Sequence, residues 1–199
     1  MDVGEAIRAR RMTRSFAERP IDHDDLLTVL DAARRAPSAG NSQGLDLLVL
    51  RGAETARYWD RTLPSPRRER FRWQGLLRAP VLIVAWTQPE AWVRRYAEDD
   101  KARTGLGAGV DQWPVPYWWV DGGQALAQLQ LAAIGLGLGV CLFGLFDHED
   151  AVREEFGVPI DRRALGAVAL GHPDGGDAPG RSADRPRREI DHVAHFGGW

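Results

Sequence analysis

The sequence is poor in cysteine, in lysine and in long apolar runs. Its single cysteine, Cys141, excludes a disulfide within the chain, which suits a reducing compartment. Lys101 is the only lysine, so arginine is the default cation and arginine clusters are weak functional signals here. No apolar stretch reaches the ~20 uninterrupted residues of a membrane span, and the N-terminus lacks the apolar run of a secretory signal. We therefore expect a cytoplasmic protein without membrane association.

The composition indicates one globular domain spanning residues 1–199. Apolar residues make up 44% of the chain, enough for a hydrophobic core in a chain of 199 residues. The formal net charge is −2, so no overall positive charge favours nucleic acid as a partner.

Helix-like and strand-like segments occur without strict β-α-β alternation. Apolar spacing predicts helices at 3–10, 24–35, 90–103, 121–136 and 148–156, and helical parts within 55–77. Buried strands are expected at 45–50, 81–86, 140–146 and 164–170. This pattern favours an α+β fold, or an irregular three-layer sandwich, over a doubly wound sheet.

Two polar segments near the N-terminus are candidate binding sites. Residues 10–16 hold three arginines within five positions, and several guanidinium groups can hold one phosphate. A solvated basic turn is the alternative. Residues 36–43 form a polar loop before a predicted strand, where Ser38, Asn41 and Gln43 offer donors and acceptors. The alternative is an ordinary helix stop, and Ala36 excludes the Gly-x-Ser-x-Gly motif of serine hydrolases.

Two further segments complete the pattern. The glycines between Gly135 and Gly144 permit close approach of a flat ligand or another chain, but they lack dinucleotide-fingerprint spacing and context. The arginines at 185, 187 and 188 lie in a tail that could simply be solvated. His192 and His195 have no neighbouring ligand cluster, so we expect no metal site. Cys141 lies in an apolar run and is expected to be a buried core residue.

Taken together, the order and spacing of these segments resemble the FMN-dependent nitroreductase family over nearly the whole chain. The matching segments are Arg10 to Phe16, Ala36 to Gln43, Gly137 to Phe143, Leu170 to Pro173, and the tail from Arg187 to Trp199. The resemblance implies a three-layer α-β-α sandwich with a mixed central sheet. It also implies a homodimer, with FMN sites at the subunit interface and a C-terminal arm, about 174–199, that reaches the partner.

The resemblance also implies roles for individual residues. Arg10 and Arg11 would hold the FMN phosphate together with Arg187 or Arg188, and Arg14 would lie near N1 and O2 of the flavin. Backbone groups of Leu142, Phe143 and Gly144 would line the ring, and the partner's loop would reach the same flavin. The full set of expected cofactor-binding residues is Arg10, Arg11, Met12, Arg14, Pro37, Ser38, Ala39, Asn41, Gln43, Leu142, Phe143, Gly144, Arg187 and Arg188.

The implied activity is hydride transfer from NAD(P)H, by a ping-pong mechanism, to a nitroaromatic, quinone or activated alkene. No side chain need act as acid or base, so we name no catalytic residue. An FMN-dependent oxidase of a small biosynthetic substrate, or a non-catalytic flavin-binding protein, remains open.

The sequence departs from the family pattern at three places. Met12 replaces a usual serine, Gly44 replaces a usual proline, and the N-x-x-K pair is missing. The five tryptophans at 86, 92, 113, 118 and 119 lie in or beside the variable region, about 87–120. They could form an aromatic lid for a flat substrate, or they could pack in a dimer core.

Overall fold

The computed structural model describes residues 1–177, 180 and 183–199, and it has the α+β architecture expected from the sequence. Positions 178–179 and 181–182 of the expected C-terminal arm lie outside the described residues. The strands are β1 (Leu45–Arg51), β2 (Val81–Thr87), β3 (Gly139–Phe143) and β4 (Arg163–Gly171). The helices are α1 (Val3–Ala9), α2 (His23–Arg34), α3 (Ala53–Thr62), α4 (Ser65–Arg68), α5 (Pro89–Tyr96), α6 (Tyr117–Gly135) and α7 (Glu149–Phe156).

The four strands form one sheet in the order β1-β2-β4-β3, and each neighbouring pair is antiparallel. A mixed sheet was expected, and this detail was wrong for the four named strands. The parallel pairing among the described residues is a single bridge between Met12 and Val140, where the N-terminal segment lies along β3. Which strands become neighbours depends on contacts far apart in the chain, and apolar periodicity does not encode them.

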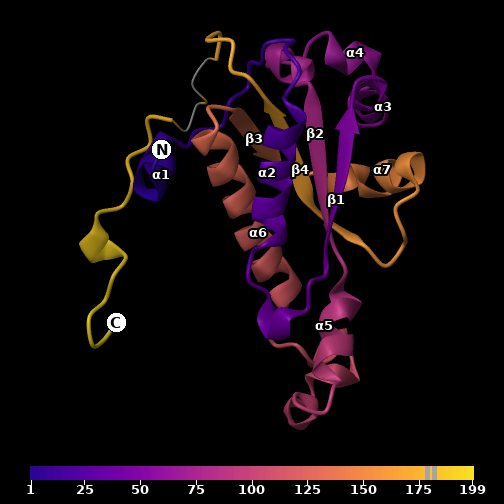
Figure 1. Ribbon diagram of the computed structural model, residues 1–199, viewed down its shortest axis with the longest axis vertical. Coiled ribbons are helices and arrows are strands. Elements are labelled where there is room, and N and C mark those ends of the chain that lie inside the picture. The colour runs from indigo at the N-terminus through magenta and orange to yellow at the C-terminus, as the bar shows by residue number, and fades with distance from the viewer. Residues whose placement is uncertain (178–179, 181–182) are drawn as a thin grey trace.

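Helices cover both faces of the sheet, which gives three layers (Figure 1). Alternate residues of β2 point to opposite faces: Ile83 packs with α1, α2 and α6, whereas Leu82 and Val84 pack with α3 and α7. All seven residues of β2 are buried. A strand covered on both faces is apolar throughout, which explains the continuous run from Val81 to Trp86.

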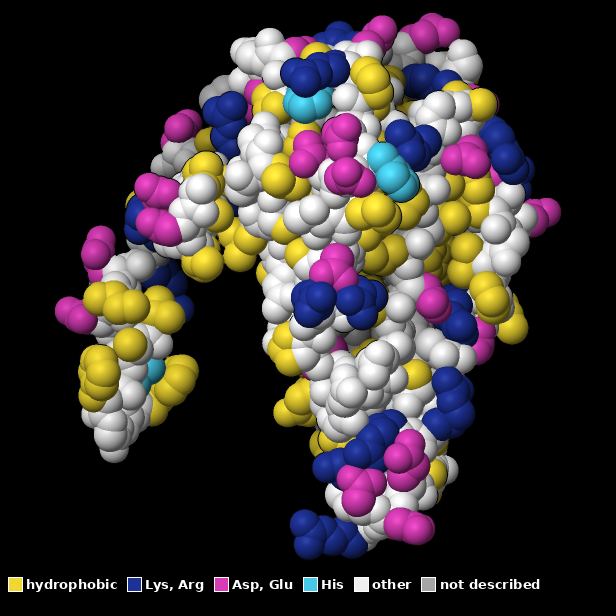
Figure 2. All heavy atoms as spheres, in the orientation of Figure 1, with side chains coloured by type: hydrophobic (Ala, Val, Ile, Leu, Met, Phe, Trp, Pro, Cys, Tyr) yellow, Lys and Arg dark blue, Asp and Glu magenta, His cyan; other side chains and the backbone are white. Residues whose placement is uncertain are grey.

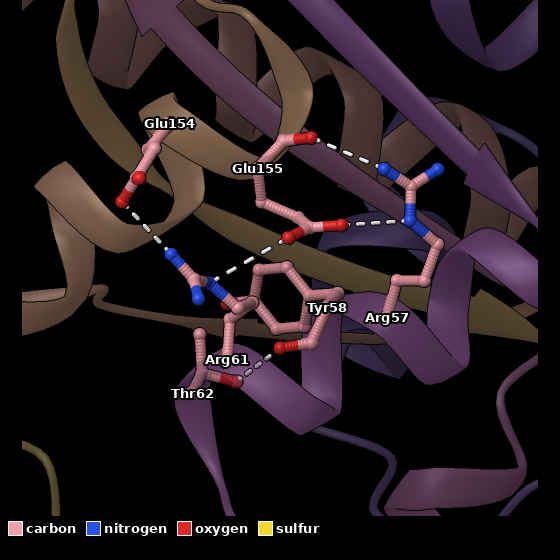
Figure 3. Close-up of polar contacts among 6 residues, drawn as sticks. All are labelled: Arg57, Tyr58, Arg61, Thr62, Glu154 and Glu155. Atoms are coloured by element: carbon pink, nitrogen blue, oxygen red, sulfur yellow. Dashed lines mark hydrogen bonds and ion pairs between the residues drawn. The ribbon is translucent and has the colours of Figure 1, made fainter.

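Ion pairs join α3 to α7 on one face (Figure 3). Arg57 Nε lies 2.7 Å from Glu155 Oε1, and the same guanidinium donates to the Glu155 carbonyl. Arg61 reaches both Glu154, at 2.9 Å, and Glu155, at 3.6 Å. Below them the ring of Tyr58 is buried, and this burial raises the pKa of its hydroxyl above the ordinary value. The two helices therefore form one wall over the sheet.

The variable region folds into a small unit with its own apolar cluster. Helix α5 ends at Tyr96, before the expected end near 103, and the chain continues in short 3₁₀ turns. Trp92, Trp113 and Trp118 pack together there, whereas Trp86, in β2, is buried in the core on the α3 and α7 face of the sheet and Trp119 is exposed. Four of the five tryptophans are therefore buried within this chain, and the substrate lid and the dimer core both stay predictions.

The C-terminal arm leaves the body of the molecule. Figure 2 shows it standing apart, with hydrophobic side chains gathered along it. Four large apolar residues at intervals of three are exposed on it, namely Ile190, Val193, Phe196 and Trp199. Among the described residues, no helix is both long and apolar enough to cross a membrane.

Candidate functional site

The basic segment 10–16 is held against the edge of the sheet. The Thr13 N–H donates to the Val140 carbonyl at 2.7 Å, and the Thr13 side chain fills the space that a Cβ on Gly139 would need, 2.8 Å away. Gly139 is therefore required for this close approach of a segment of the same chain. Arg10 ends α1, and Arg11 projects into solvent.

Arg14 is fixed by several neighbours. Its backbone N–H donates to Asp177 Oδ1 at 2.9 Å, and its guanidinium donates to the Met12 carbonyl at 3.3 Å. The guanidinium carbon also lies 5.2 Å from the centre of the Trp73 ring, within reach of a cation–π interaction. The next residue, Ser15, donates from its hydroxyl to Asp174 Oδ2 at 2.9 Å.

Asp174 connects this segment to the end of β4. Its pKa is held below the usual range, first by the Gly176 N–H, then by the Ser15 hydroxyl, and also by the guanidinium of Arg78. Arg78 in turn donates to the Phe16 carbonyl at 3.1 Å. These contacts fix the direction in which the chain presents Arg14.

Arg14 lines a cavity of about 360 Å³ together with the end of β3. Leu142, Phe143 and Gly144 lie in its wall, so four of the expected flavin residues converge on one space. The rest of the wall is mainly aromatic and comes from α3 and the segment before β2, with Tyr58, Trp59, Phe71 and Trp73. The rings of Trp59 and Phe143 are stacked, with centres 5.8 Å apart.

Two polar groups in this wall lack partners. The indole N–H groups of Trp59 and Trp73 are buried and have no hydrogen-bond acceptor among the described residues. A buried donor without an acceptor is unfavourable, so these two N–H groups need an acceptor that the described residues do not supply. Sequence reasoning missed both tryptophans because they lie in a charged stretch without a recognisable motif.

The second expected segment, the 37–43 loop, follows α2 and enters β1. Gly40, Asn41 and Gln43 have left-handed φ values of 63°, 59° and 52°. The Gln43 N–H donates to Ser38 Oγ at 3.1 Å, and the side chains of Asn41 and Gln43 are exposed. The Ala39 N–H donates to Asp121, a buried acid that the sequence did not single out.

This loop borders a different cavity of about 600 Å³, between α2, β1 and the start of α6. Pro37, Ser38 and Gln43 lie in its wall, with Asp121 and Trp92. In Figure 1 the loop lies at the lower end of α2 beside α5, whereas residues 10–16 run from α1 to the upper end. Within one chain, the two groups of expected flavin residues therefore occupy separate places.

The tail arginines lie on the arm. Arg187 and Arg188 are exposed, and Arg188 donates to the backbone carbonyl of His192. Among the described residues, no hydrogen bond joins either of them to Arg10, Arg11 or Arg14. Their expected role at a phosphate stays a prediction.

Cys141 is a buried core residue, as expected. It lies in β3, and burial raises the pKa of its thiol. Among the described residues no group of His, Cys, Asp and Glu could hold a metal ion.

Comparisons with known proteins bear on the family and the fold. Residues 7–172 match the model of the nitroreductase family. The chain is 31% identical to the 4-nitrobenzoate reductase of a Nocardioides species, over 84% of this chain and 79% of that one. It is 29% identical to the NADH dehydrogenase of Thermus thermophilus, over 87% of each chain. A nitroreductase-type protein of Desulfovibrio desulfuricans, solved in complex with FMN, has the same fold, with a TM-score of 0.67, 21% identity, and coverage of 98% and 95%.

Proposed function

Because the chain belongs to the nitroreductase family, we propose that it is an FMN-dependent oxidoreductase that takes hydride from NADH or NADPH and passes it to a nitroaromatic, quinone or activated alkene. The observation that carries the proposal is the convergence of Arg14 and the residues 142–144 on one aromatic cavity. The named activities of the Nocardioides and Thermus relatives support the acceptor and the donor, respectively.

The residues of this cavity fit the ring of FMN. Its walls are aromatic, and flat rings pack well against such walls. Arg14, in the same wall, would donate from its guanidinium to a carbonyl oxygen of the ring. Bound FMN would supply the hydride chemistry, and the protein would supply binding, orientation and charge.

Each expected residue then has a task. Arg14 would place positive charge beside the pyrimidine end of the ring, where the cation favours added negative charge. Arg10 and Arg11 would hold the phosphate, with Arg187 or Arg188 from an arm. Backbone groups of residues 142–144 would fix the face of the ring next to β3. None of these tasks requires a side chain to carry a proton.

We further propose that two chains share each site. The 37–43 loop and the Arg14 cavity occupy separate places in one chain, so both can reach one FMN only if a second copy brings its loop. The exposed apolar residues of the arm and the exposed Leu27 of α2 would find cover in such a dimer. FMN should then stabilise the dimer, because half of the site leaves with each partner.

Anaerobic stopped-flow reduction with NADH and with NADPH tests this function. The purified protein should be yellow and should release FMN, not FAD, on denaturation. Reduction by a nicotinamide, followed by steady turnover with a quinone or 4-nitrobenzoate, is the expected result. Oxygen consumption with an organic donor but no reduction by nicotinamide would instead indicate an oxidase. A protein that is colourless and does not bind added FMN would contradict the proposal.

A further inference from the structure

Residues of the segment 89–121, here called the aromatic unit, form hydrogen bonds with the backbone of the 37–43 loop. The Ala39 N–H donates to Asp121 Oδ2 at 2.8 Å, and the Gly40 carbonyl accepts from Arg95 Nε at 2.8 Å. Arg95 is itself held by Asp100 through two contacts of 2.7 and 2.8 Å. The loop is thus bound through both a donor and an acceptor of its backbone, by two residues far from it in the sequence.

Asp121 joins the loop to Trp92 at a buried point. The residue is only 6% exposed, and its Oδ2 also accepts from Trp92 Nε1 at 2.9 Å. Gln124 approaches its other oxygen at 3.3 Å. None of the ion pairs between described residues includes Asp121, so N–H groups surround this carboxylate in place of a cation. A buried carboxylate is tolerated only when it is well hydrogen-bonded, which makes the loop amide and the indole parts of one unit.

Trp92 also packs directly on the end of the loop. A Cβ placed on Gly44 would lie 2.2 Å from Trp92 Cζ3 and 2.8 Å from the Ala91 Cβ. Only glycine fits here, so the ring occupies space that the usual proline of the family pattern would need. The glycine at position 44 is therefore explained by its contact with the ring of Trp92.

The loop needs such support because its backbone is strained. Asn41 and Gln43 both adopt left-handed φ values, which non-glycine residues rarely do. Such conformations persist where the surroundings over-determine them, and they frequently occur at ligand sites. The grip on Ala39 and Gly40 therefore sets the direction of the exposed Asn41 and Gln43 side chains.

We propose that Asp121 is a positioning residue, which fixes the 37–43 loop in its FMN-binding shape by tying it to Trp92. On this view the aromatic unit is a rigid brace for the loop and not a mobile cover over the substrate. The inference rests on the proposed function in one respect only, the identification of the loop as part of an FMN site. The tie between loop and unit can be tested without FMN.

Two substitutions remove the tie with little change in shape. Asp121→Asn replaces one accepting oxygen by a donor, and Trp92→Phe removes the indole N–H while retaining an aromatic ring against Gly44. The matched control is Asp111→Asn, at an exposed acid of the same unit whose side chain makes no hydrogen bond or ion pair with a described residue. FMN affinity is measured by quenching of flavin fluorescence. We expect binding to weaken about ten- to hundredfold in the first two variants, as for loss of a charge-assisted hydrogen bond, and to stay within about twofold in the control.

The double variant tests whether both residues act through the same contact. Combined with Asp121→Asn, Trp92→Phe should weaken FMN binding less than it does alone. If the losses of FMN affinity in the two single variants multiply in the double variant, the two residues do not act through a shared contact and the proposal is overturned. If Asp121→Asn does not fold, the FMN affinity of Trp92→Phe is compared with that of the Asp111→Asn control. This comparison still tests the tie, because Trp92→Phe leaves the Asp121 carboxylate and its contact to Ala39 in place.

Hydrogen exchange of the FMN-free protein gives the readout that is independent of cofactor. Amides of residues 38–43 should exchange faster in Asp121→Asn than in the wild type, while in the wild type the loop and residues 89–113 exchange equally slowly. Fast exchange of 89–113 beside a protected loop would show a mobile cover and overturn the brace. A wild type that never binds FMN would defeat the proposed function alone. A wild type that binds FMN, with Asp121→Asn unchanged in affinity and exchange, would defeat the present inference alone.

Discussion

Replacing Gly44 with alanine should destabilise the protein by about 2–4 kcal/mol. The new methyl group would lie 2.2 Å from Trp92 Cζ3, whereas carbon atoms in contact prefer about 3.5–4.0 Å. The ring must therefore move by more than about 1 Å, and over-packing of this kind costs roughly 1–3 kcal/mol. Movement also strains the 2.9 Å bond from Trp92 Nε1 to Asp121, which adds about 1.5 kcal/mol or more. The lower entropy of the unfolded alanine chain offsets roughly 0.4–1 kcal/mol.

Urea unfolding at fixed protein concentration measures this effect. The midpoint should fall with the slope unchanged, because the native fold is retained. Gly135→Ala is the control: this residue ends α6, no atom lies within 4 Å of a Cβ there, and the helix should gain up to about 1 kcal/mol.

Repeating Gly44→Ala in a Trp92→Leu background identifies the cause. Leucine lacks the ring edge that meets the new methyl group, so the penalty should fall to the part that arises from the Ala91 Cβ, 2.8 Å from the new methyl carbon. An equal penalty in both backgrounds would show that the cost arises elsewhere, and the contact between Gly44 and Trp92 would lose its assigned importance.

Four further outcomes are expected. Asp174→Asn should lower the urea midpoint at pH 7, and the difference from wild type should fade below pH ~4. The pKa of Asp174 is lower in the folded protein than in the unfolded chain, so its charged form stabilises the fold at pH values above the unfolded pKa. That stability is lost as the pH falls through the folded-state pKa. A difference in midpoint that stays constant with pH would contradict this prediction. Arg14→Ala should lower the flavin midpoint potential in a spectroelectrochemical titration, and an unchanged potential with unchanged FMN affinity would place Arg14 elsewhere. Cys141 should react with iodoacetamide at pH 8 far more slowly in the native than in the urea-unfolded protein, because burial raises its pKa; equal rates would refute this. Truncation after Gly180 should weaken dimerisation and FMN binding together, whereas a monomer in light scattering that retains one FMN per chain would refute the shared site.

Local patterns predicted most of the elements. The run from Val81 to Trp86 is a fully buried strand, and the spacing of Leu126, Leu129 and Ala133 marks the buried face of α6. The start of α6 was placed four residues late, at 121 and not at Tyr117, because aromatic residues after a proline carry little helix signal. Helix α5 ends early at Tyr96 because the chain turns back: a Cβ on Gly107 would lie 2.5 Å from the Ala97 backbone.

Contacts between residues far apart in the chain could not be predicted from the sequence. Arg14 was identified from its motif, but its contacts with Trp73 and Asp177 join segments about 60 and 160 residues away. Asp121 had no motif, and its importance arises only when α6 brings it to the Ala39 amide. The roles of the expected site residues at FMN stay predictions, because they concern a bound group and a second chain.

The departures from the family pattern follow from neighbours that are particular to this chain. At the position of the usual serine, the sulfur of Met12 accepts from the Leu142 N–H at 3.4 Å, a weak substitute on the strand that lines the cavity. At the position of the usual proline, Gly44 makes room for Trp92. In the segment before β2, the ring centre of Trp73 lies 5.2 Å from the guanidinium carbon of Arg14 and 5.4 Å from that of Arg72. The changes at Met12 and Gly44 are thus matched by contacts from elsewhere in the fold, so reverting either position alone should disturb the site more than it restores the family pattern.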